Sequence, residues 1–373
     1  GRNLQIPLIY GNPQSRSASF AKAQSKSLTQ SAKLKDFLLT RVSDYALATI
    51  QNEVLLASQG DAGAFLEAAT VEINGAINAL TRSQAIAMYK SGYGEIGQIK
   101  AGFAVTGPTI QLAVAADVTN FEVGMELEVS ATLSGALKAL GTSGNGLIIT
   151  GIDRGAGVLT FAYDIDDAAN GIPTIAAGDY IFASGDHVSG SITKLAGLEA
   201  WLPATAPTSG DSFFGVDRSA DVTRLSGQRQ NSVGQPIEEA LIDGASLVAR
   251  EGGKLSHFVM GFGKFAELEK SLGSKVQYVD LKVNADVGFR GIMVNGVAGP
   301  IKVIGDMNCP SNRVYGLQMD TWRLNTLGSA VRVLDTDGLQ MLRQNTSDGV
   351  EVRYGYYGQL SCNAPGFNIN IQV

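Results

Sequence analysis

The chain has 373 residues, which is enough for two or three domains, each with its own core. Charged residues make up 17% of the sequence, against about 25% in ordinary soluble domains, so we expect much of the surface to end in protein contacts. The net charge of -6 argues against a direct nucleic-acid binder, because such proteins neutralise phosphates with Lys and Arg. No apolar stretch approaches the ~20 residues of a membrane span, so no membrane partner is expected.

In residues 1–27, apolar residues alternate along the sequence around a central turn signal at Gly11, Asn12 and Pro13. This pattern predicts a β-hairpin. An isolated two-stranded hairpin is only marginally stable in water, so the hairpin needs a surface to lie on. That surface can belong to a neighbouring subunit or to the hairpin's own subunit, and the residues leave both readings open.

Two helices are expected next. The first covers residues 28–56, and its apolar side is marked by Phe37, Leu38, Val42, Tyr45, Leu47 and Ile50. The second covers residues 61–90, where the apolar residues recur at three- and four-residue steps, at Leu66, Ala69, Ile73, Ala76, Ile77 and Leu80. Asp61 can cap this helix and Gly92 can end it. At 1.5 Å per residue it would be about 45 Å long, and small residues such as Gly75 would let neighbours approach closely.

After the long helix the composition changes to short apolar runs separated by Gly, Asp and Asn. We expect strands at residues 109–114, 125–131, 146–152, 158–163 and 180–183. Their spacing predicts a small all-β barrel or sandwich over residues 100–188, inserted into the rest of the chain. The phrase GLEAWLP at residues 197–203 predicts a fixed hinge that Trp201 anchors and Pro203 ends.

Residues 210–234 carry four arginines and no regular period, which predicts a long ordered loop. An α/β pattern begins at Pro236, with expected helices over residues 236–250 and 264–272. Expected strands in this segment cover residues 257–262, 276–283, 291–295 and 301–305. Alternation of apolar and polar residues with a period of two then predicts strands in the tail from residue 331. Each strand would have one buried face and one solvent-exposed face.

The sequence contains little evidence for a catalytic site. Gly92, Gly94 and Gly97 match G-x-G-x-x-G, but they follow a helix and precede strands, whereas a dinucleotide site needs the reverse order. His187 and His257 have no ligand partner at metal-site spacing, so we expect satisfied structural histidines. We expect Cys309 and Cys362 to be two reduced thiols. The residues therefore predict no catalytic residues, no cofactor and no metal.

Seven stretches together carry a resemblance to a known family. They are IPLIYGNPQSRSASF (6–20), LLTRVSDYALATI (38–50), DAGAFLEAATVEINGAINAL (61–80), GLEAWLPA (197–204), FFGVDRSADVTRL (213–225), PIEEAL (236–241) and VLDTDGLQMLRQNTSDGVEVRYGYYGQLSCNAPG (333–366). They resemble the major capsid proteins of tailed bacteriophages with the Hong Kong 97-type capsid fold, which is an α+β fold. These stretches correspond to structural segments of the fold and contain no active-site signature.

The resemblance implies a division of the chain into six parts. These are an N-terminal extended loop (1–27), a peripheral domain (28–99) whose spine is the helix 61–90, an inserted β domain (100–188), a return to the peripheral domain with a connecting loop (189–235), an axial domain (236–328) and C-terminal strands returning to the peripheral domain (329–373). Ten residues are candidates for contacts between subunits, namely Ile6, Leu8, Tyr10, Asn12, Pro13, Arg16, Phe20, Arg218, Arg224 and Arg229.

The implied function is that of a non-enzymatic subunit that assembles with itself into hexamers and pentamers of an icosahedral shell. The shell would enclose double-stranded DNA without sequence-specific binding, as the capsid of a virion assembled in the bacterial cytoplasm. Portal, scaffold and decoration proteins are the further candidate partners. Some relatives are cross-linked between lysine and asparagine; because only Lys22 and Lys26 follow the expected hairpin tip, we expect no cross-link here.

Three alternatives stay open. The first is the shell of an encapsulin-like nanocompartment that encloses enzyme cargo, and the second is an NAD-dependent oxidoreductase resting on residues 92–97. The third is carbohydrate binding by the β insertion, which would need exposed aromatic side chains. Its aromatic residues, most of which we expect to face a core, are Phe103, Phe121, Phe161, Tyr163, Tyr180 and Phe182.

Overall fold

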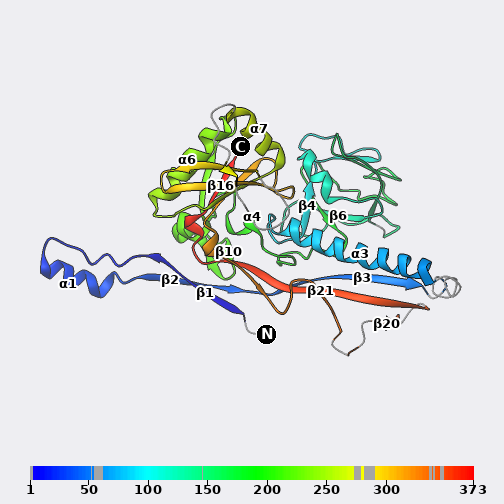
Figure 1. Cartoon of the computed structure of the whole chain (residues 1–373), viewed down its shortest axis with the longest axis horizontal. Helices are drawn as coiled ribbons and strands as arrows, with labels where there is room; N and C mark the ends of the chain where they lie inside the picture. Colours follow the sequence, from blue (N-terminus) through cyan, green and yellow to red (C-terminus); the bar gives the residue numbers. More distant parts are fainter. Residues whose placement is uncertain are drawn as a thin grey trace.

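The computed structural model describes residues 3–51, 53, 62–144, 146–272, 279–280, 290–335, 338, 341–344 and 348–373. Figure 1 shows an elongated molecule in which a long β-hairpin projects from one end. Two compact units, each with its own sheet, lie above a long ribbon of paired strands that continues the line of the hairpin. The chain is thus of mixed α and β structure, as the sequence predicts.

The projecting hairpin, here called the arm, consists of β1 (Leu4–Gly11), α1 (Phe20–Thr29) and β2 (Lys33–Leu39). β1 pairs antiparallel with β2, from Leu4 opposite Leu39 to Gly11 opposite Lys33. The hairpin expected within residues 1–27 was therefore wrong in its second strand. The chain passes Gly11 without turning back, forms α1 at the far end of the arm and returns as β2 (Figure 1).

The ribbon is formed by β3 (Val42–Gln51) and β21 (Gly349–Cys362), which pair antiparallel from Val42 opposite Gly358 to Gln51 opposite Gly349. The other edge of β21 pairs with β18 (Trp322–Thr326), β19 (Arg332–Val333) and β20 (Leu342–Arg343). The helix predicted over residues 28–56 was wrong, because this segment forms β2 and β3. Tyr45 and Leu47 are exposed on one face of β3 while Ala48 and Ile50 are buried on the other, so apolar residues on both faces obscured the period of two.

The long helix α3 (Ala62–Ala87) lies along the ribbon, as Figure 1 shows. At 1.5 Å per residue it spans about 39 Å. Its stripe of Ile73, Ala76, Ile77 and Leu80 packs against Ala46, Ala48, Val352 and Tyr354 of the two strands, which confirms this part of the predicted apolar face. The side chains of Leu66 and Ala69 and the cap at Asp61 lie outside the described residues. Gly75 does not serve close packing, since a Cβ there would meet nothing within 4 Å.

The unit beyond α3, here called the β4–β9 unit, has a six-stranded sheet in the order β4-β9-β6-β7-β8-β5. Its elements are β4 (Glu95–Gln98), β5 (Thr109–Gln111), η2 (Ala115–Asn120), β6 (Glu126–Ser130), β7 (Leu147–Asp153), β8 (Val158–Phe161) and β9 (Tyr180–Ala183). All five predicted strands are present, and β4 begins before the expected boundary at residue 100. Among the described residues, every buried member of its core lies between Ile96 and Ile181.

The segment after this unit, expected to be a hinge and a long loop, contains short pieces of structure. They are α4 (Leu198–Trp201), β10 (Ser212–Phe213), β11 (Val216–Asp217), η3 (Arg218–Asp221), α5 (Val222–Ser226) and β12 (Gln228–Asn231). Trp201 is fully buried and anchors α4, as predicted. The loop prediction missed these elements because each is too short to show a period.

The last unit, here called the α6–α7 unit, has a sheet in the order β12-β22-β17-β13-β16-β15-β14. Its other elements are α6 (Ile237–Arg250), β13 (His257–Met260), α7 (Phe262–Leu272), β14 (Val279–Asp280), β15 (Arg290–Gly296), β16 (Gly299–Gly305), β17 (Arg313–Leu317), η5 (Met319–Thr321), η6 (Pro365–Phe367) and β22 (Ile369–Gln372). The predicted helix and strand order is confirmed where it is described, but most of the strand expected over 276–283 lies outside the described residues.

The C-terminal strands divide between the two sheets. β21 lies in the ribbon, as expected for the tail, whereas β22 pairs with β12 and β17 in the sheet of the α6–α7 unit. One face of that sheet packs Phe258, Met260 and Ile371 under α6 and α7. Its other face contributes Tyr315 and Leu317 to the core beneath the arm root. The C-terminus therefore ties the α6–α7 unit to the ribbon.

Candidate subunit interface

The root of the arm is packed firmly on its own chain. Leu8, Phe37 and Leu39 are 7%, 0% and 3% exposed and belong to the core around Trp201. The ring centroids of Phe37 and Trp201 are 5.1 Å apart, edge to face, and those of Trp201 and Phe213 are 5.0 Å apart. Such aromatic pairs add to the stabilisation from burial alone, so the root fixes the direction in which the arm leaves the body.

A tight turn between β10 and β11 holds β2 in place. Phe214 has φ 46° and Gly215 has φ 80°, both in the left-handed region that suits a two-residue hairpin turn. Phe214 is the one non-glycine residue with positive φ among those described. Its carbonyl oxygen accepts a hydrogen bond from the Leu38 N–H at 2.9 Å, and its ring is buried against Trp201. The strained residue thus lies where the arm joins the body.

The three candidate arginines serve this junction from within the chain. Arg218 is 5% exposed, donates to the Ala200 carbonyl at 2.7 Å and lies over the Phe213 ring; burial lowers its pKa to about 10. Arg229 donates to the Pro203 carbonyl at 2.9 Å, and burial lowers its pKa too. Arg224 donates to the carbonyl of Tyr10 at 2.9 Å. Arg218 and Arg229 therefore have little side-chain surface to offer a neighbour, whereas Arg224 holds the arm.

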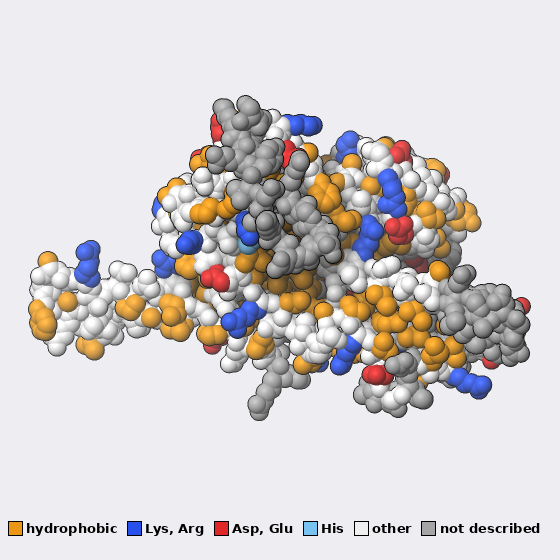
Figure 2. All heavy atoms as spheres, viewed as in Figure 1, with side chains coloured by type: hydrophobic (Ala, Val, Ile, Leu, Met, Phe, Trp, Pro, Cys, Tyr) orange, Lys and Arg blue, Asp and Glu red, His pale blue; other side chains and the backbone are white. Residues whose placement is uncertain are grey.

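The distal arm, residues 9–36, has no buried side chain, and the structure describes every residue in this range. Phe20 is 84% exposed and Leu28 is 85% exposed on α1, with Ile9 at 60% and Leu34 at 56% on the two strands. Figure 2 shows hydrophobic side chains along the projecting arm. Burying one such side chain is worth about 1.5–3 kcal/mol, so covering the arm with another surface would be favourable.

The ribbon also has an apolar exposed face. Tyr45 and Leu47 of β3 are 51% and 54% exposed on the side away from α3. The ring of Tyr45 meets that of Tyr357 on β21 at 5.9 Å between centroids. Hydrophobic side chains gather over the ribbon in Figure 2, separate from those of the arm. The molecule therefore exposes apolar surface on two elongated elements, a distribution typical of a subunit that is completed by neighbours.

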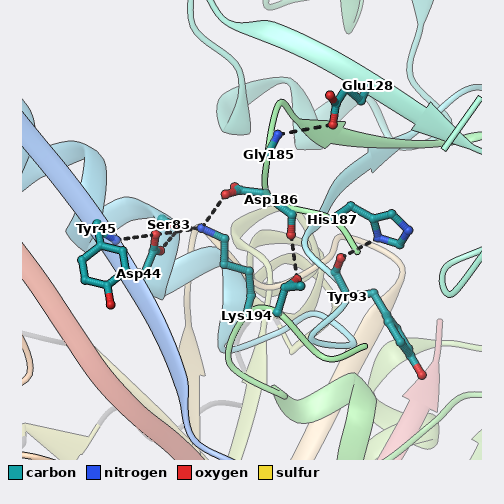
Figure 3. A network of polar contacts seen from close by, with 10 residues as sticks. Asp44, Tyr45, Ser83, Tyr93, Glu128, Gly185, Asp186, His187 and Lys194 are labelled. Atoms are coloured by element: carbon teal, nitrogen blue, oxygen red, sulfur yellow. Dashed lines mark hydrogen bonds and ion pairs between the residues drawn. The ribbon is translucent and has the colours of Figure 1, made fainter. Parts of the chain in front are cut away.

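A buried polar network fixes the β4–β9 unit on α3 and β3 (Figure 3). The Lys194 Nζ lies 2.8 Å from Asp44 Oδ1 and 2.9 Å from Asp186 Oδ1, and Ser83 donates to Asp44 Oδ2 at 2.6 Å. Burial lowers the pKa of Lys194, but the two carboxylates outweigh it and raise the pKa overall. The network joins four separate segments and favours a fixed orientation of the unit.

The residues singled out for chemistry have structural roles. A Cβ on Gly94 would lie 2.5 Å from the Asp186 carbonyl oxygen, and one on Gly97 would lie 2.9 Å from the Phe121 ring, so close packing explains these glycines. His187 is 4% exposed, and its ring nitrogens lie 3.0 and 2.8 Å from the carbonyl oxygens of Tyr93 and Gly135, so its role is structural, as expected. His257 contacts the Ser256 hydroxyl.

Cys309 and Cys362 are free and buried, and burial raises the pKa of Cys362 to about 12, which makes it a poor nucleophile. In the described ranges, no three His, Cys, Asp or Glu side chains form a group that could hold a metal ion. No described helix combines the length and the hydropathy needed to cross a bilayer. In the β4–β9 unit Phe121, Phe161 and Phe182 are buried, and Tyr163 is 58% exposed.

The structure distributes the ten candidate contact residues unevenly. Leu8 is buried at the root and Ile6 and Tyr10 are half-buried, whereas Asn12, Pro13, Arg16 and Phe20 lie exposed beyond the paired strands. Whether a neighbour touches any of them stays a prediction. The contact candidates did not include Leu28, and the sequence analysis placed Lys22 and Lys26 after the tip, whereas all three lie on α1 at the far end of the arm. The premise that no lysine lies near the tip was therefore wrong.

No protein-family model and no curated protein matches the chain. Among solved structures, all of the chain is similar to 88% of a chain of the cyanophage A-1(L) capsid, with 12% identity and a TM-score of 0.50. It is also similar over its full length to 85% of a chain from the capsid of a native GTA particle, with 11% identity and a TM-score of 0.46. A likeness to an encapsulin of Synechococcus elongatus involves 39% of this chain and 52% of that chain, with 13% identity and a TM-score of 0.29. The chain therefore has the fold of a phage capsid protein.

Proposed function

We propose that this chain is the major capsid protein of a tailed, double-stranded DNA bacteriophage and assembles into hexamers and pentamers of an icosahedral shell. The observation that carries the proposal is the arm, an ordered hairpin whose distal residues 9–36 bury no side chain in the subunit itself. Its combination with a phage-capsid fold favours a protein whose exposed arm is covered by the next copy.

In the Hong Kong 97-type fold, the arm would be the extended loop and α3 the spine of the peripheral domain. The ribbon would complete that domain, the α6–α7 unit would be the axial domain, and the β4–β9 unit would be an insertion between α3 and α4. The hydrogen bonds from the Thr193 and Lys194 N–H groups to the Gly92 carbonyl, both 3.0 Å long, bring the two ends of this insertion together. Portal, scaffold and decoration proteins are the additional partners that the proposal expects.

The test shortens the arm without disturbing its root. Residues 12–32 are replaced by Asn-Gly, because Gly11 and Lys33 are paired and a two-residue turn can join them. We expect the unfolding free energy of the subunit to change by less than about 1 kcal/mol, since the removed side chains are not buried. We expect particles to be lost in sedimentation and negative-stain microscopy.

A control variant, Val297→Ser, removes another exposed apolar side chain, 76% exposed at the turn between β15 and β16. It tests whether loss of particles follows from loss of any surface apolar group. Normal particles from the shortened protein would contradict the proposal. The nanocompartment alternative predicts that particles contain a co-purifying enzyme in place of DNA.

A further inference from the structure

A cleft of about 170 Å³ lies where the β4–β9 unit, α4 and the α6–α7 unit meet. Gln98 and Tyr180 line it from the β4–β9 unit, Glu199 from α4 and Arg313 from β17 of the α6–α7 unit. Figure 1 shows α4 at the boundary between the two units, and each unit has a core of its own. A change of charge in this cleft therefore acts on the contact between two separately packed bodies.

The acids in the cleft outnumber the bases. The side chains that carry charge there are Lys90, Glu95, Asp117, Glu199 and Arg313. Three acids against two bases give a net charge of -1 when all five are ionised. The Lys90 Nζ lies 3.3 Å from Asp117 Oδ2, and the carboxylate of Glu95 accepts hydrogen bonds from the N–H and the hydroxyl of Ser91 at 2.7 and 2.8 Å. Two of the three acids therefore have direct partners.

Glu199 is the third acid, and it lacks such a partner. Among the described residues, its half-buried carboxylate makes no hydrogen bond and no ion pair. Burial raises the pKa of Glu199, and the negative charges of Glu95 and Asp117 raise it further, whereas Lys90 and Arg313 lower it only in part. The excess negative charge of the cleft therefore falls on Glu199.

The tyrosines beside Glu199 offer no charge to neutralise it. Burial, and then the charge of Glu199, raise the pKa values of Tyr180 on β9 and of Tyr315 on β17, so both stay neutral. Tyr315 is fully buried, and in the described part of the chain its hydroxyl has no hydrogen-bond partner. The contact on α3 and β3 differs, because its acid Asp186 lies 2.9 Å from Lys194. The β4–β9 unit thus has one paired contact and one that lacks a positive charge.

We propose that Glu199 takes up a proton that holds the β4–β9 unit against the α6–α7 unit, and that loss of this proton opens the cleft between them. A neutral carboxyl group can stay in the closed cleft, whereas a carboxylate buried without a partner is costly until water enters. The closed cleft binds the proton more tightly than the open one. Closure is therefore favoured as the pH falls and is lost as the pH rises through the raised pKa of Glu199.

The first test measures the proton in unassembled subunits, so it does not depend on the proposed shell function. Glu199→Gln keeps the shape of the side chain and removes its charge. At pH 8 this variant should lower the equilibrium constant for urea unfolding by about threefold or more, because the buried charge is gone. At pH 5 the difference should shrink, since Glu199 of the unmodified chain then carries the proton.

Two further variants accompany this measurement. Glu239→Gln, exposed on α6, makes the same change outside the cleft and should match the unmodified chain at both pH values. Arg313→Gln removes the facing positive charge and should raise the unfolding constant, more at pH 8 than at pH 5. The Arg313 side chain makes no hydrogen bond or ion pair among the residues that the structure describes, so its loss acts through charge. This variant tests the proposal even if Glu199→Gln does not fold.

The second test measures the opening. Val123→Cys in the β4–β9 unit and Val297→Cys in the α6–α7 unit replace side chains that are 63% and 76% exposed, and they carry a donor and an acceptor dye. The native Cys309 and Cys362 are 5% and 1% exposed and should not react. Raising the pH from 5 to 8 should lower the efficiency of energy transfer between the dyes, and Glu199→Gln should abolish this change.

Equal unfolding constants for Glu199→Gln and the unmodified chain at pH 8 would overturn the proposal. So would a gain of the same size at pH 5 and pH 8, because it would come from the amide and not from a proton. An energy transfer that does not depend on pH would mean that Glu199 titrates in a fixed cleft, and the opening would be wrong. Because both tests use single subunits, none of these results decides whether the chain forms a shell.

Discussion

At the scale of single residues, Gly197, which directly precedes α4, packs tightly against the C-terminal end of α3. A Cβ at this position would lie 2.2 Å from the carbonyl oxygen of Ala87 and 2.4 Å from the carbonyl carbon of Met88. The Gly197 N–H donates to the Lys90 carbonyl at 3.0 Å, and the Leu198 N–H donates to the Met88 carbonyl at 2.7 Å. The backbone just after α3 cannot move away without breaking these bonds, so the position requires glycine for space.

We therefore expect Gly197→Ala to lower the free energy of unfolding of the subunit by about 1–3 kcal/mol, the usual cost of forcing an extra group into a packed site. Urea unfolding of unassembled subunits, followed by far-ultraviolet circular dichroism, measures this change. Gly75→Ala, within α3, is the matched control. Its Cβ meets nothing within 4 Å, so it should stabilise the helix by about 0.5–1 kcal/mol. Equal midpoints for Gly197→Ala and the unmodified chain would contradict the argument.

At the scale of elements, β3 separates two roles on its two faces. Its covered face meets Leu80 of α3, which is 2% exposed, while Leu47 on the other face is 54% exposed. The covered face holds the subunit together. The exposed face, under the shell proposal, is available to a neighbour.

This division predicts different results for two similar truncations. Leu80→Ala should lower the free energy of unfolding of the isolated subunit by about 2–5 kcal/mol, as for other buried leucines. Leu47→Ala should change it by less than about 0.5 kcal/mol and instead reduce particle yield. Denaturant unfolding and analytical ultracentrifugation measure the two quantities. The assignment of faces is wrong if Leu47→Ala destabilises the subunit as much as Leu80→Ala.

The same strand explains where sequence reasoning succeeded and failed. The helix α3 and the short strands of the β4–β9 unit were predictable, because each has one buried face and a clear period. β2 and β3 were not, since Leu38, Tyr45 and Leu47 are apolar on the face that the subunit leaves exposed. A pattern read for one chain misleads when part of its apolar surface is not buried in that chain.

The position of the arm in the sequence was predictable, but its extent was not. The turn signal at Gly11, Asn12 and Pro13 marks the end of β1, yet the partner strand lies more than twenty residues later. Nothing local to residues 12–32 encodes that pairing, because it depends on Phe37 and Leu39 reaching the core around Trp201. Arg218 and Arg229 illustrate the converse, since both were candidates for contacts between subunits and the chain uses them to bond its own carbonyls.

At the scale of the whole molecule, the parts differ in how far they depend on one another. The core beneath the arm root draws residues from β1, β2, α4, β10, β17 and β21, and thus from most of the chain. The β4–β9 unit has a core of its own, and its two ends meet where the Thr193 N–H donates to the Gly92 carbonyl. Such closed ends are typical of an insertion that folds as a unit.

We therefore expect residues 92–193, produced as a separate chain, to fold cooperatively with an unfolding free energy of about 5 kcal/mol or more. Dispersed amide signals in a proton–nitrogen correlation spectrum, together with a sigmoidal urea transition, would show this. Residues 3–41, which contain the arm, are the contrasting fragment: Leu8, Phe37 and Leu39 would lose the partners that bury them, so this fragment should remain unfolded. A collapsed but non-cooperative 92–193 fragment would mean that the unit needs its contacts through Lys194 and Lys90, and that the chain folds as one body.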